Sequence, residues 1–123
     1  MHAEKKQTRG EEISTEYFKF LEQHIEDVIS GQASDFMELN QIASELAVSH
    51  KHLTHVIQKE FGEHPCHFYD FKIIEKVKEI LSGTNLSIAE IARKFTYDPS
   101  NFSKFFKKWT GETPGNFRKK NKK

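Results

Sequence analysis

Two stretches of the chain combine basic and hydrogen-bonding side chains and contain no carboxylate. They run from His50 to Lys59 and from Pro99 to Lys108. Lys donates hydrogen bonds and carries a positive charge, while Ser, Thr and Asn both donate and accept. Ordinary solvated helices mix both signs of charge, as residues 75–79 do. Lysines on a face without carboxylates attract phosphates, so both stretches predict contact with an anionic partner.

The histidines raise the alternative of a metal site. His50, His52 and His55 form one candidate group, and Cys66 with its neighbours His64 and His67 forms a second. On a helix His52 and His55 share a face, but His50 and His52 do not. Neither group has zinc-finger spacing, so metal binding is the weaker alternative and we expect no cofactor. Imidazoles near phosphates would instead gain protons and make anion binding depend on pH.

Catalysis is not expected. The chain has no glycine-rich phosphate loop, no paired carboxylate site and no nucleophile motif. Isolated Ser, His and Asp residues carry no catalytic meaning without a shared geometry. We therefore predict a binding protein rather than an enzyme.

The charge is divided unevenly along the 123 residues, although the net charge is only +1. Residues 1–50 hold four basic and ten acidic side chains, and residues 93–123 hold ten basic and two acidic ones. A basic half suggests a polyanion such as DNA, with a solvated basic tail at 118–123 as the simpler explanation. One cysteine, no apolar run of about 20 residues and no hydrophobic leader favour a cytoplasmic protein.

Apolar spacing predicts helices almost throughout, and hence an all-α fold. Residues 1–13 are polar and are expected to be disordered, with Ser14 or Thr15 capping the first helix. Ser49, Ser87 and Asp98-Pro99 are further start signals, and glycines follow several helices. The predicted helices run over 14–29, from Asp35 or Glu38, over 49–61, over 65–82, from Ser87, over 98–110 and from Pro114. The apolar stripe expected for the helix over 65–82 is Phe68, Phe71, Ile74, Val77 and Leu81.

An internal repeat organises these helices. Shifting the chain by 49 residues superimposes 42–68 on 91–117 without a gap, with seven identities and five further positions apolar in both copies. Gly62-Glu63 then meets Gly111-Glu112, and Pro65 meets Pro114. Each copy is a short helix, a tight turn and a longer helix, which is the helix-turn-helix layout. We predict subdomains over 14–64 and 83–123, the second with a basic C-terminal tail, joined by a linking helix over 65–82.

The stretch from about Met37 to Arg118 resembles the DNA-binding domain of the AraC/XylS family of bacterial transcription regulators. The similar segments are IASELAVSHKHLTHVIQKEFGEHP, FKIIEKVKEILSGTNLSIAEIA and DPSNFSKFFKKWTGETPGNFR. The resemblance implies seven helices, with recognition helices over 49–61 and 98–110. These would read successive major-groove segments about one DNA turn, roughly 34 Å, apart.

The resemblance also implies roles for the exposed residues of both recognition helices. Candidates for contact with base edges are His50, Lys51, Thr54, His55, Ser100, Ser103 and Lys104. Candidates for contact with phosphates are His52, Lys59, Asn101, Lys107 and Lys108. The amides that open the helices at Ser49 and Ser87 are further phosphate candidates.

Three positions depart from the family pattern. Ten residue steps separate Ala92 from Phe102, one fewer than the family usually has. Thr96 stands where the family usually has Gly, and Ile73 stands where it commonly has Arg. From these departures we expect a changed tilt of the second recognition helix.

The expected partner is double-stranded DNA, with RNA polymerase as a further candidate and no membrane. Many relatives carry a sensor or dimerisation domain, which does not fit into the first thirteen residues. The chain is therefore expected to act as a monomer or to be a fragment of a larger regulator. The rival hypothesis is a helical protein–protein interaction module that binds no DNA.

Overall fold

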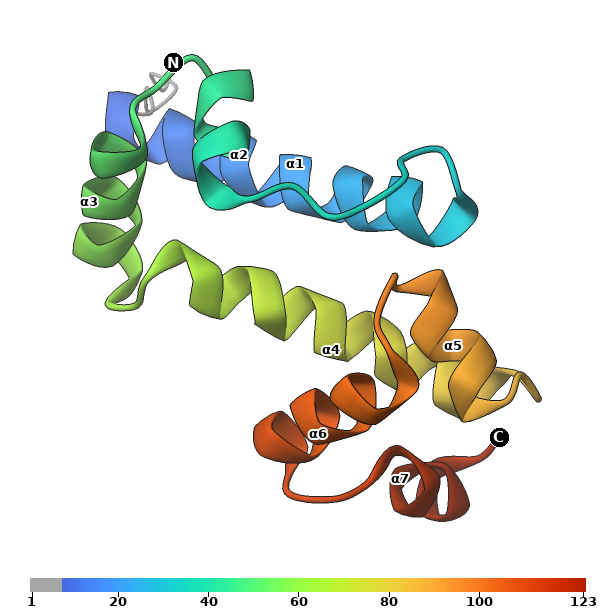
Figure 1. The fold of residues 1–123 in the computed structure, drawn as a ribbon. Coiled ribbons are helices and arrows are strands. Elements are labelled where there is room, and N and C mark those ends of the chain that lie inside the picture. Colours follow the sequence, from blue (N-terminus) through green and yellow to red (C-terminus); the bar gives the residue numbers. More distant parts are fainter. Residues whose placement is uncertain (1–7) are drawn as a thin grey trace, which may run out of the picture. The chain divides into compact units, whose positions relative to one another are not determined.

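The computed structural model describes residues 8–123, and within that range the chain forms seven helices and no strand (Figure 1). This confirms the predicted all-α fold. The helices are α1 (Arg9–Ser30), α2 (Leu39–Glu45), α3 (His50–Phe61), α4 (Pro65–Gly83), α5 (Ile88–Lys94), α6 (Pro99–Thr110) and α7 (Pro114–Asn121). None of these helices combines the length and the apolar character that crossing a membrane requires.

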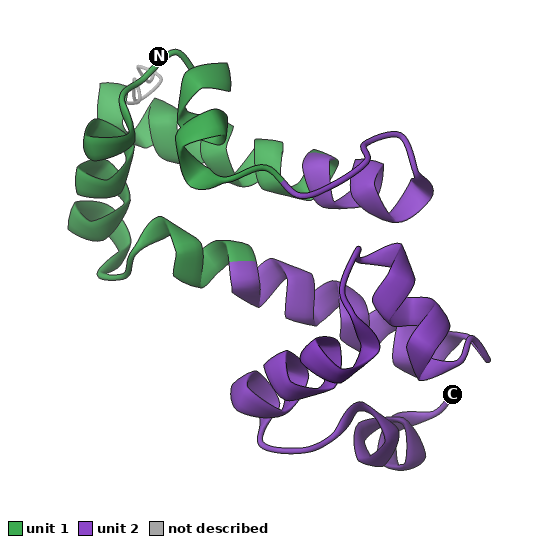
Figure 2. Cartoon of the chain, viewed as in Figure 1, with its two compact units in different colours: residues 1–23, 37–69 green, residues 24–36, 70–123 purple. Residues whose placement is uncertain are grey.

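The chain forms two compact units, drawn in green and purple in Figure 2. Unit 1 comprises residues 1–23 and 37–69, and unit 2 comprises 24–36 and 70–123. The last turns of α1 and the loop after it therefore belong with the second helix pair. The predicted division into 14–64, 65–82 and 83–123 remains a prediction about subdomains.

The first helix begins earlier than the sequence pattern predicted. Thr8 and Glu11 bond reciprocally, with the Thr8 amide on Glu11 Oε1 at 2.8 Å and the Glu11 amide on Thr8 Oγ1 at 3.1 Å. This capping box starts α1 at Arg9. The prediction that residues 1–13 are disordered was therefore wrong for residues 9–13. Residues 1–7 lie outside the part of the chain that the structure describes. Ser14 is not a cap, because it is buried and donates to the Gly10 carbonyl (3.1 Å) or to Glu60 Oε1 (2.5 Å).

Aromatic side chains and one buried hydrogen bond hold unit 1 together. The Tyr17 hydroxyl donates to the Pro65 carbonyl at 2.8 Å and is buried. Phe18 packs edge-on against Phe61 and Phe68, with ring centroids 5.1 and 5.4 Å apart. These contacts fasten α1 to the end of α3 and the start of α4, so the helix-turn-helix has a rigid support.

The apolar stripe of α4 differs from the prediction at one position. Phe71 is 47% exposed, whereas Ile73 is 3% exposed. Two residues along a helix differ by about 200° in direction, so both cannot face the core. Ile73 fits the buried row that continues through Val77 and Leu81 at steps of four residues.

The C-terminal residues are bound to the end of α4, so the solvated-tail explanation was wrong for Arg118. The Arg118 guanidinium donates to the carbonyls of Leu81 (2.9 Å), Leu86 (2.5 Å) and Thr84 (3.3 Å). The Lys122 ammonium also donates to the Thr84 carbonyl. A cation at a helix C-terminus satisfies carbonyls that have no partner in the helix. Arg118 is therefore a structural residue of unit 2.

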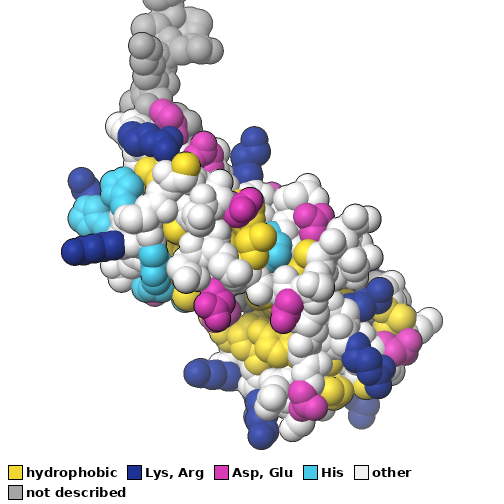
Figure 3. Space-filling model, turned by 45° about the horizontal axis from the view of Figure 1, so that its top comes forward, with side chains coloured by type: hydrophobic (Ala, Val, Ile, Leu, Met, Phe, Trp, Pro, Cys, Tyr) yellow, Lys and Arg dark blue, Asp and Glu magenta, His cyan; other side chains and the backbone are white. Residues whose placement is uncertain are grey.

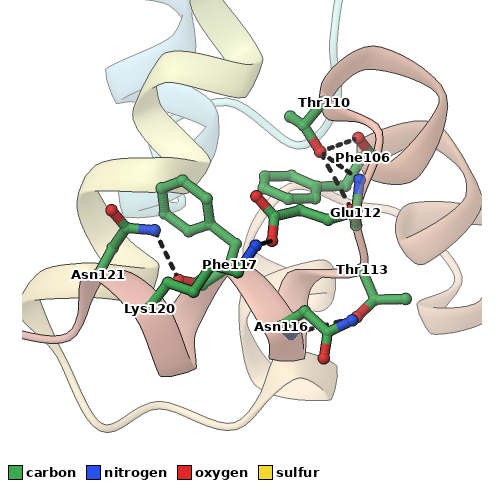
Figure 4. A network of polar contacts seen from close by, with 8 residues as sticks. All are labelled: Phe106, Thr110, Glu112, Thr113, Asn116, Phe117, Lys120 and Asn121. Atoms are coloured by element: carbon green, nitrogen blue, oxygen red, sulfur yellow. Dashed lines mark hydrogen bonds and ion pairs between the residues drawn. The ribbon is translucent and has the colours of Figure 1, made fainter.

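A polar network holds the corner between α6 and α7 (Figure 4). The Thr110 hydroxyl donates to the Phe106 carbonyl at 2.8 Å and accepts from the Glu112 amide at 3.3 Å. Lys120 Nζ lies 3.3 Å from Glu112 Oε1, which is buried. The network fixes α7 beside the C-terminal end of α6.

Candidate nucleic-acid interface

The turns between the paired helices have the same hydrogen bonds. In the first turn, the Ala43 carbonyl accepts from the amides of Leu46 (3.1 Å) and Val48 (3.0 Å). In the second, the Ala92 carbonyl accepts from the amides of Phe95 (3.1 Å) and Tyr97 (2.9 Å). The four donating amides and the two accepting carbonyls are related by the 49-residue shift. The repeat in the sequence is therefore a repeat of backbone geometry.

Each turn places one residue other than glycine at positive φ. Ala47 has φ of 59° and Thr96 has φ of 60°. Left-handed conformations are unfavourable for residues with a Cβ and most unfavourable for β-branched ones. Thr96 makes a side-chain bond that Ala47 cannot make, since its hydroxyl donates to Asp35 Oδ1 at 2.8 Å. The shorter spacing between Ala92 and Phe102 therefore gives the second turn the same geometry as the first. The changed tilt of the second recognition helix, relative to the family, remains a prediction.

Both longer helices start and end at the predicted residues. The Ser49 hydroxyl accepts from the His52 amide at 3.0 Å, and Asp98 Oδ2 accepts from the Ser100 amide at 3.1 Å. Gly62 and Gly111 end the helices with φ of 78° and 85°, values that glycine adopts at little cost. The caps give α3 and α6 equal lengths of twelve residues.

The buried faces of α3 and α6 orient their exposed faces. Leu53, Val56 and Ile57 are buried in α3, and Phe102 and Phe106 are buried in α6. Tyr97 and Phe105 stack with ring centroids 5.4 Å apart beside the second core. Because these positions face inward, the residues between them face solvent.

The predicted contact residues of α3 lie on its outer face. His50, Lys51 and His55 are exposed and Thr54 is half-buried. The phosphate candidates His52 and Lys59 are also exposed. Figure 3 shows histidine side chains beside Lys and Arg side chains over this helix. Within residues 8–123 neither Lys51 nor Lys59 forms an ion pair, so both charges remain available to a ligand.

The predicted contact residues of α6 have the same arrangement. Ser100 and Lys104 are exposed and Ser103 is half-buried. The phosphate candidates of this helix are all exposed, namely Asn101, Lys107 and Lys108. Among the described residues no carboxylate pairs with Lys104, Lys107 or Lys108. The face therefore carries three uncompensated positive charges.

The amide of Ser87 is already occupied. It donates to Glu90 Oε1 at 2.9 Å, while the Ser87 hydroxyl accepts from the Glu90 amide at 3.0 Å. The pKa of the Glu90 carboxyl is lowered, chiefly by the hydrogen bond from the Ser87 amide. A phosphate at this amide would have to displace a carboxylate, which weakens the prediction for Ser87 relative to the Lys residues.

The second histidine group has a local role that the sequence reasoning missed. His64 Nδ1 accepts from the Cys66 amide at 3.0 Å, and His67 Nδ1 lies 3.9 Å from Glu63 Oε2. Both contacts lie at the start of α4, where the first resembles a side-chain cap and the second joins two side chains. In the part of the chain that the structure describes, no three His, Cys, Asp or Glu residues form a group that could hold a metal ion.

Two capped helix-turn-helix units define a class of DNA-binding fold. A family model described as a helix-turn-helix domain matches residues 42–120, which include α3, α6 and the turns that precede them. The chain belongs to the AraC/XylS family of helix-turn-helix transcription regulators, as a DNA-binding domain of that family. This confirms the resemblance in the sequence, and the family is not a class of enzymes.

Known proteins with similar sequence or structure agree with this assignment. The chain is 34% identical over 95 residues to the uncharacterized HTH-type transcriptional regulator YfiF of Bacillus subtilis, covering 77% of this chain and 29% of that protein. It superimposes with a TM-score of 0.79, at 28% identity, on the C-terminal domain of AraT, a response regulator from Geobacillus stearothermophilus, covering 94% of this chain and 91% of that one.

A third similarity concerns the fold alone. The DNA-binding domain of AdpA, solved in complex with a target DNA, has a TM-score of 0.70 at 15% identity, with 88% of this chain and 90% of that one covered. The chain spans less than a third of the length of the curated relatives it matches.

Proposed function

We propose that α3 and α6 read two successive major-groove segments of one DNA duplex, about one helical turn apart. The observation that carries this proposal is the repeated turn. The same backbone hydrogen bonds occur in both turns, and each turn leads into a capped helix of twelve residues. Two equivalent helices in one chain would give it two DNA-reading elements, for which other helix-turn-helix proteins need a dimer.

The exposed residues divide into two roles. His50, Lys51, Thr54 and His55 of α3, and Ser100, Ser103 and Lys104 of α6, contact base edges through their hydrogen-bonding groups. His52, Lys59, Asn101, Lys107 and Lys108 contact phosphates, which positions the helices without reading sequence. Ser87 is the weakest phosphate contact, because Glu90 occupies its amide.

The chain acts in the bacterial cytoplasm as a transcription regulator or as the DNA-binding part of one. It either binds DNA alone, as a monomer, or is a fragment of a larger regulator that carries a sensor or dimerisation domain. RNA polymerase is a candidate protein partner of such a regulator.

Two lysines of α6 test the division of roles. Lys104→Ala should weaken binding to a selected duplex by about 1–3 kcal/mol and relax the preference at one base pair. Lys108→Ala should weaken binding to all sequences alike and reduce the slope of log K against log salt by about 1. The measurement is fluorescence anisotropy on selected and random duplexes at several salt concentrations. Equal losses on both duplexes for Lys104→Ala would contradict its base-reading role.

A further inference from the structure

We propose that Asp35 is a positioning residue for the second recognition helix, because its carboxylate holds Thr96 in the left-handed conformation from which α6 starts. Asp35 lies in the loop between α1 and α2, 61 residues before Thr96 and in the same compact unit. The part of this inference that concerns DNA rests on the proposed role of α6.

The conformation of Thr96 requires an explanation. Its φ of 60° is one that β-branched side chains rarely adopt. Its amide donates to the Arg93 carbonyl at 2.9 Å, which fixes one side of the residue, and its hydroxyl donates to Asp35 Oδ1 at 2.8 Å on the other. Asp98, which caps α6, follows two residues later. A change in the backbone of Thr96 therefore changes the direction in which α6 begins.

Asp35 is itself held in place by its neighbour. The Phe36 amide donates to Asp35 Oδ1 at 2.8 Å. The Phe36 ring stacks on Phe95 at 6.5 Å and meets His24 edge-on at 5.9 Å. These contacts bring the loop to the C-terminal end of α5, where the carboxylate can reach the turn. The pKa of Asp35 is lowered, first by the hydrogen bond from Thr96 and then by that from the Phe36 amide.

The first turn serves as a comparison, because its residue at positive φ makes no side-chain hydrogen bond like that from Thr96 to Asp35. Ala47 has the same φ, but it has no β-branch and no side-chain hydrogen bond. The backbone bonds alone therefore suffice for a small side chain. Thr96 has a larger conformational cost, and a carboxylate contributed by a distant loop offsets it.

The test is a double-mutant cycle of Asp35→Ala and Thr96→Gly, with Asp35→Asn as the conservative variant and Ser34→Ala as the control in the same loop. Hydrogen exchange of single amides, measured by NMR without DNA, reports on the turn. We expect Asp35→Ala to speed exchange at Thr96 and Tyr97 by about 2- to 10-fold, the effect of one lost hydrogen bond. Exchange at Ala47 and Val48 in the first turn should not change.

The same variants are then measured on a selected duplex. Asp35→Ala should relax base preference in the segment read by α6 and leave the segment read by α3 unchanged, whereas a general loss of stability would affect both. Asp35→Asn should keep the wild-type preference, because its side-chain oxygen still accepts the bond. Thr96→Gly should remove the effect of Asp35→Ala, since glycine adopts positive φ without support.

The outcomes separate the two claims. Unchanged exchange in Asp35→Ala, or an equal effect of Asp35→Ala in the Thr96→Gly background, would overturn the positioning role. Altered exchange in a protein that shows no base preference would support the positioning role and contradict the proposed function of α6.

Discussion

The two helix-turn-helix units have different side chains in their cores, although their turns have the same geometry. Leu53, Val56 and Ile57 line α3, whereas Phe102 and Phe106 line α6. The turns nevertheless share their hydrogen bonds, their positive-φ position and their caps. The comparison teaches that turn bonds and caps determine the backbone geometry, while the core needs only apolar side chains that fill the available volume.

The exposed faces of the two helices also differ. α3 presents His50, His52 and His55 with two lysines, and α6 presents three lysines and no histidine. The units therefore share a geometry and differ in the type of basic side chain that they expose.

Removing a core side chain should produce the largest effect. Phe102→Ala should lower the free energy of unfolding by about 3–5 kcal/mol, because a fully buried ring leaves a cavity. Urea unfolding followed by circular dichroism measures the loss. Phe71→Ala is the matched control on an exposed ring, and a loss as large as that of Phe102→Ala would contradict the assigned core.

The helix caps should contribute similar, smaller amounts in both units. Ser49→Ala and Asp98→Ala should each cost about 0.5–2 kcal/mol of unfolding free energy, because each leaves helix amides without an acceptor. Thermal unfolding of the two variants checks this. Asn85→Ala, at an exposed loop position, serves as the control. A cap effect in one unit only would show that the two turns are not energetically equivalent.

The smallest effect should be a dependence of unit 2 stability on His24. Burial lowers the pKa of this imidazole, and Asp27 partly opposes the shift. The unfolded chain then binds more protons than the folded one as the pH falls below about 6.5, so the free energy of unfolding decreases there and levels off below the folded pKa. Urea unfolding at pH 5 and pH 7.5 should show a smaller decrease in His24→Gln. An unchanged decrease would exclude His24 as its source.

The sequence predicted the features that are encoded locally or repeated. Ser49, Ser87, Asp98, Gly62 and Gly111 were identified as helix boundaries because caps depend on residue types a few positions apart. The outer faces of α3 and α6 followed from the apolar spacing of the residues between them. The capping box of Thr8 and Glu11 was also readable, but the polar composition of the first thirteen residues suggested disorder instead.

The remaining features depend on contacts between distant residues. Nothing near Arg118 in the sequence indicates that it binds carbonyls at the end of α4, more than 30 residues earlier. The bond from Thr96 to Asp35 likewise joins a turn to a loop 61 residues away. Phe71 was placed in the core because it lies three residues from both Phe68 and Ile74, although Ile73 fits the four-residue steps of the buried row.

Selection of bound sequences from random DNA tests most directly whether both recognition helices, α3 and α6, read the same duplex. If α3 and α6 both enter the major groove, the selected sites should contain two blocks of preferred bases with centres about 10–10.5 base pairs apart. Lys104→Ala should then alter one block, and Lys51→Ala should alter the other. A single block, or two blocks that change together in both variants, would contradict the account.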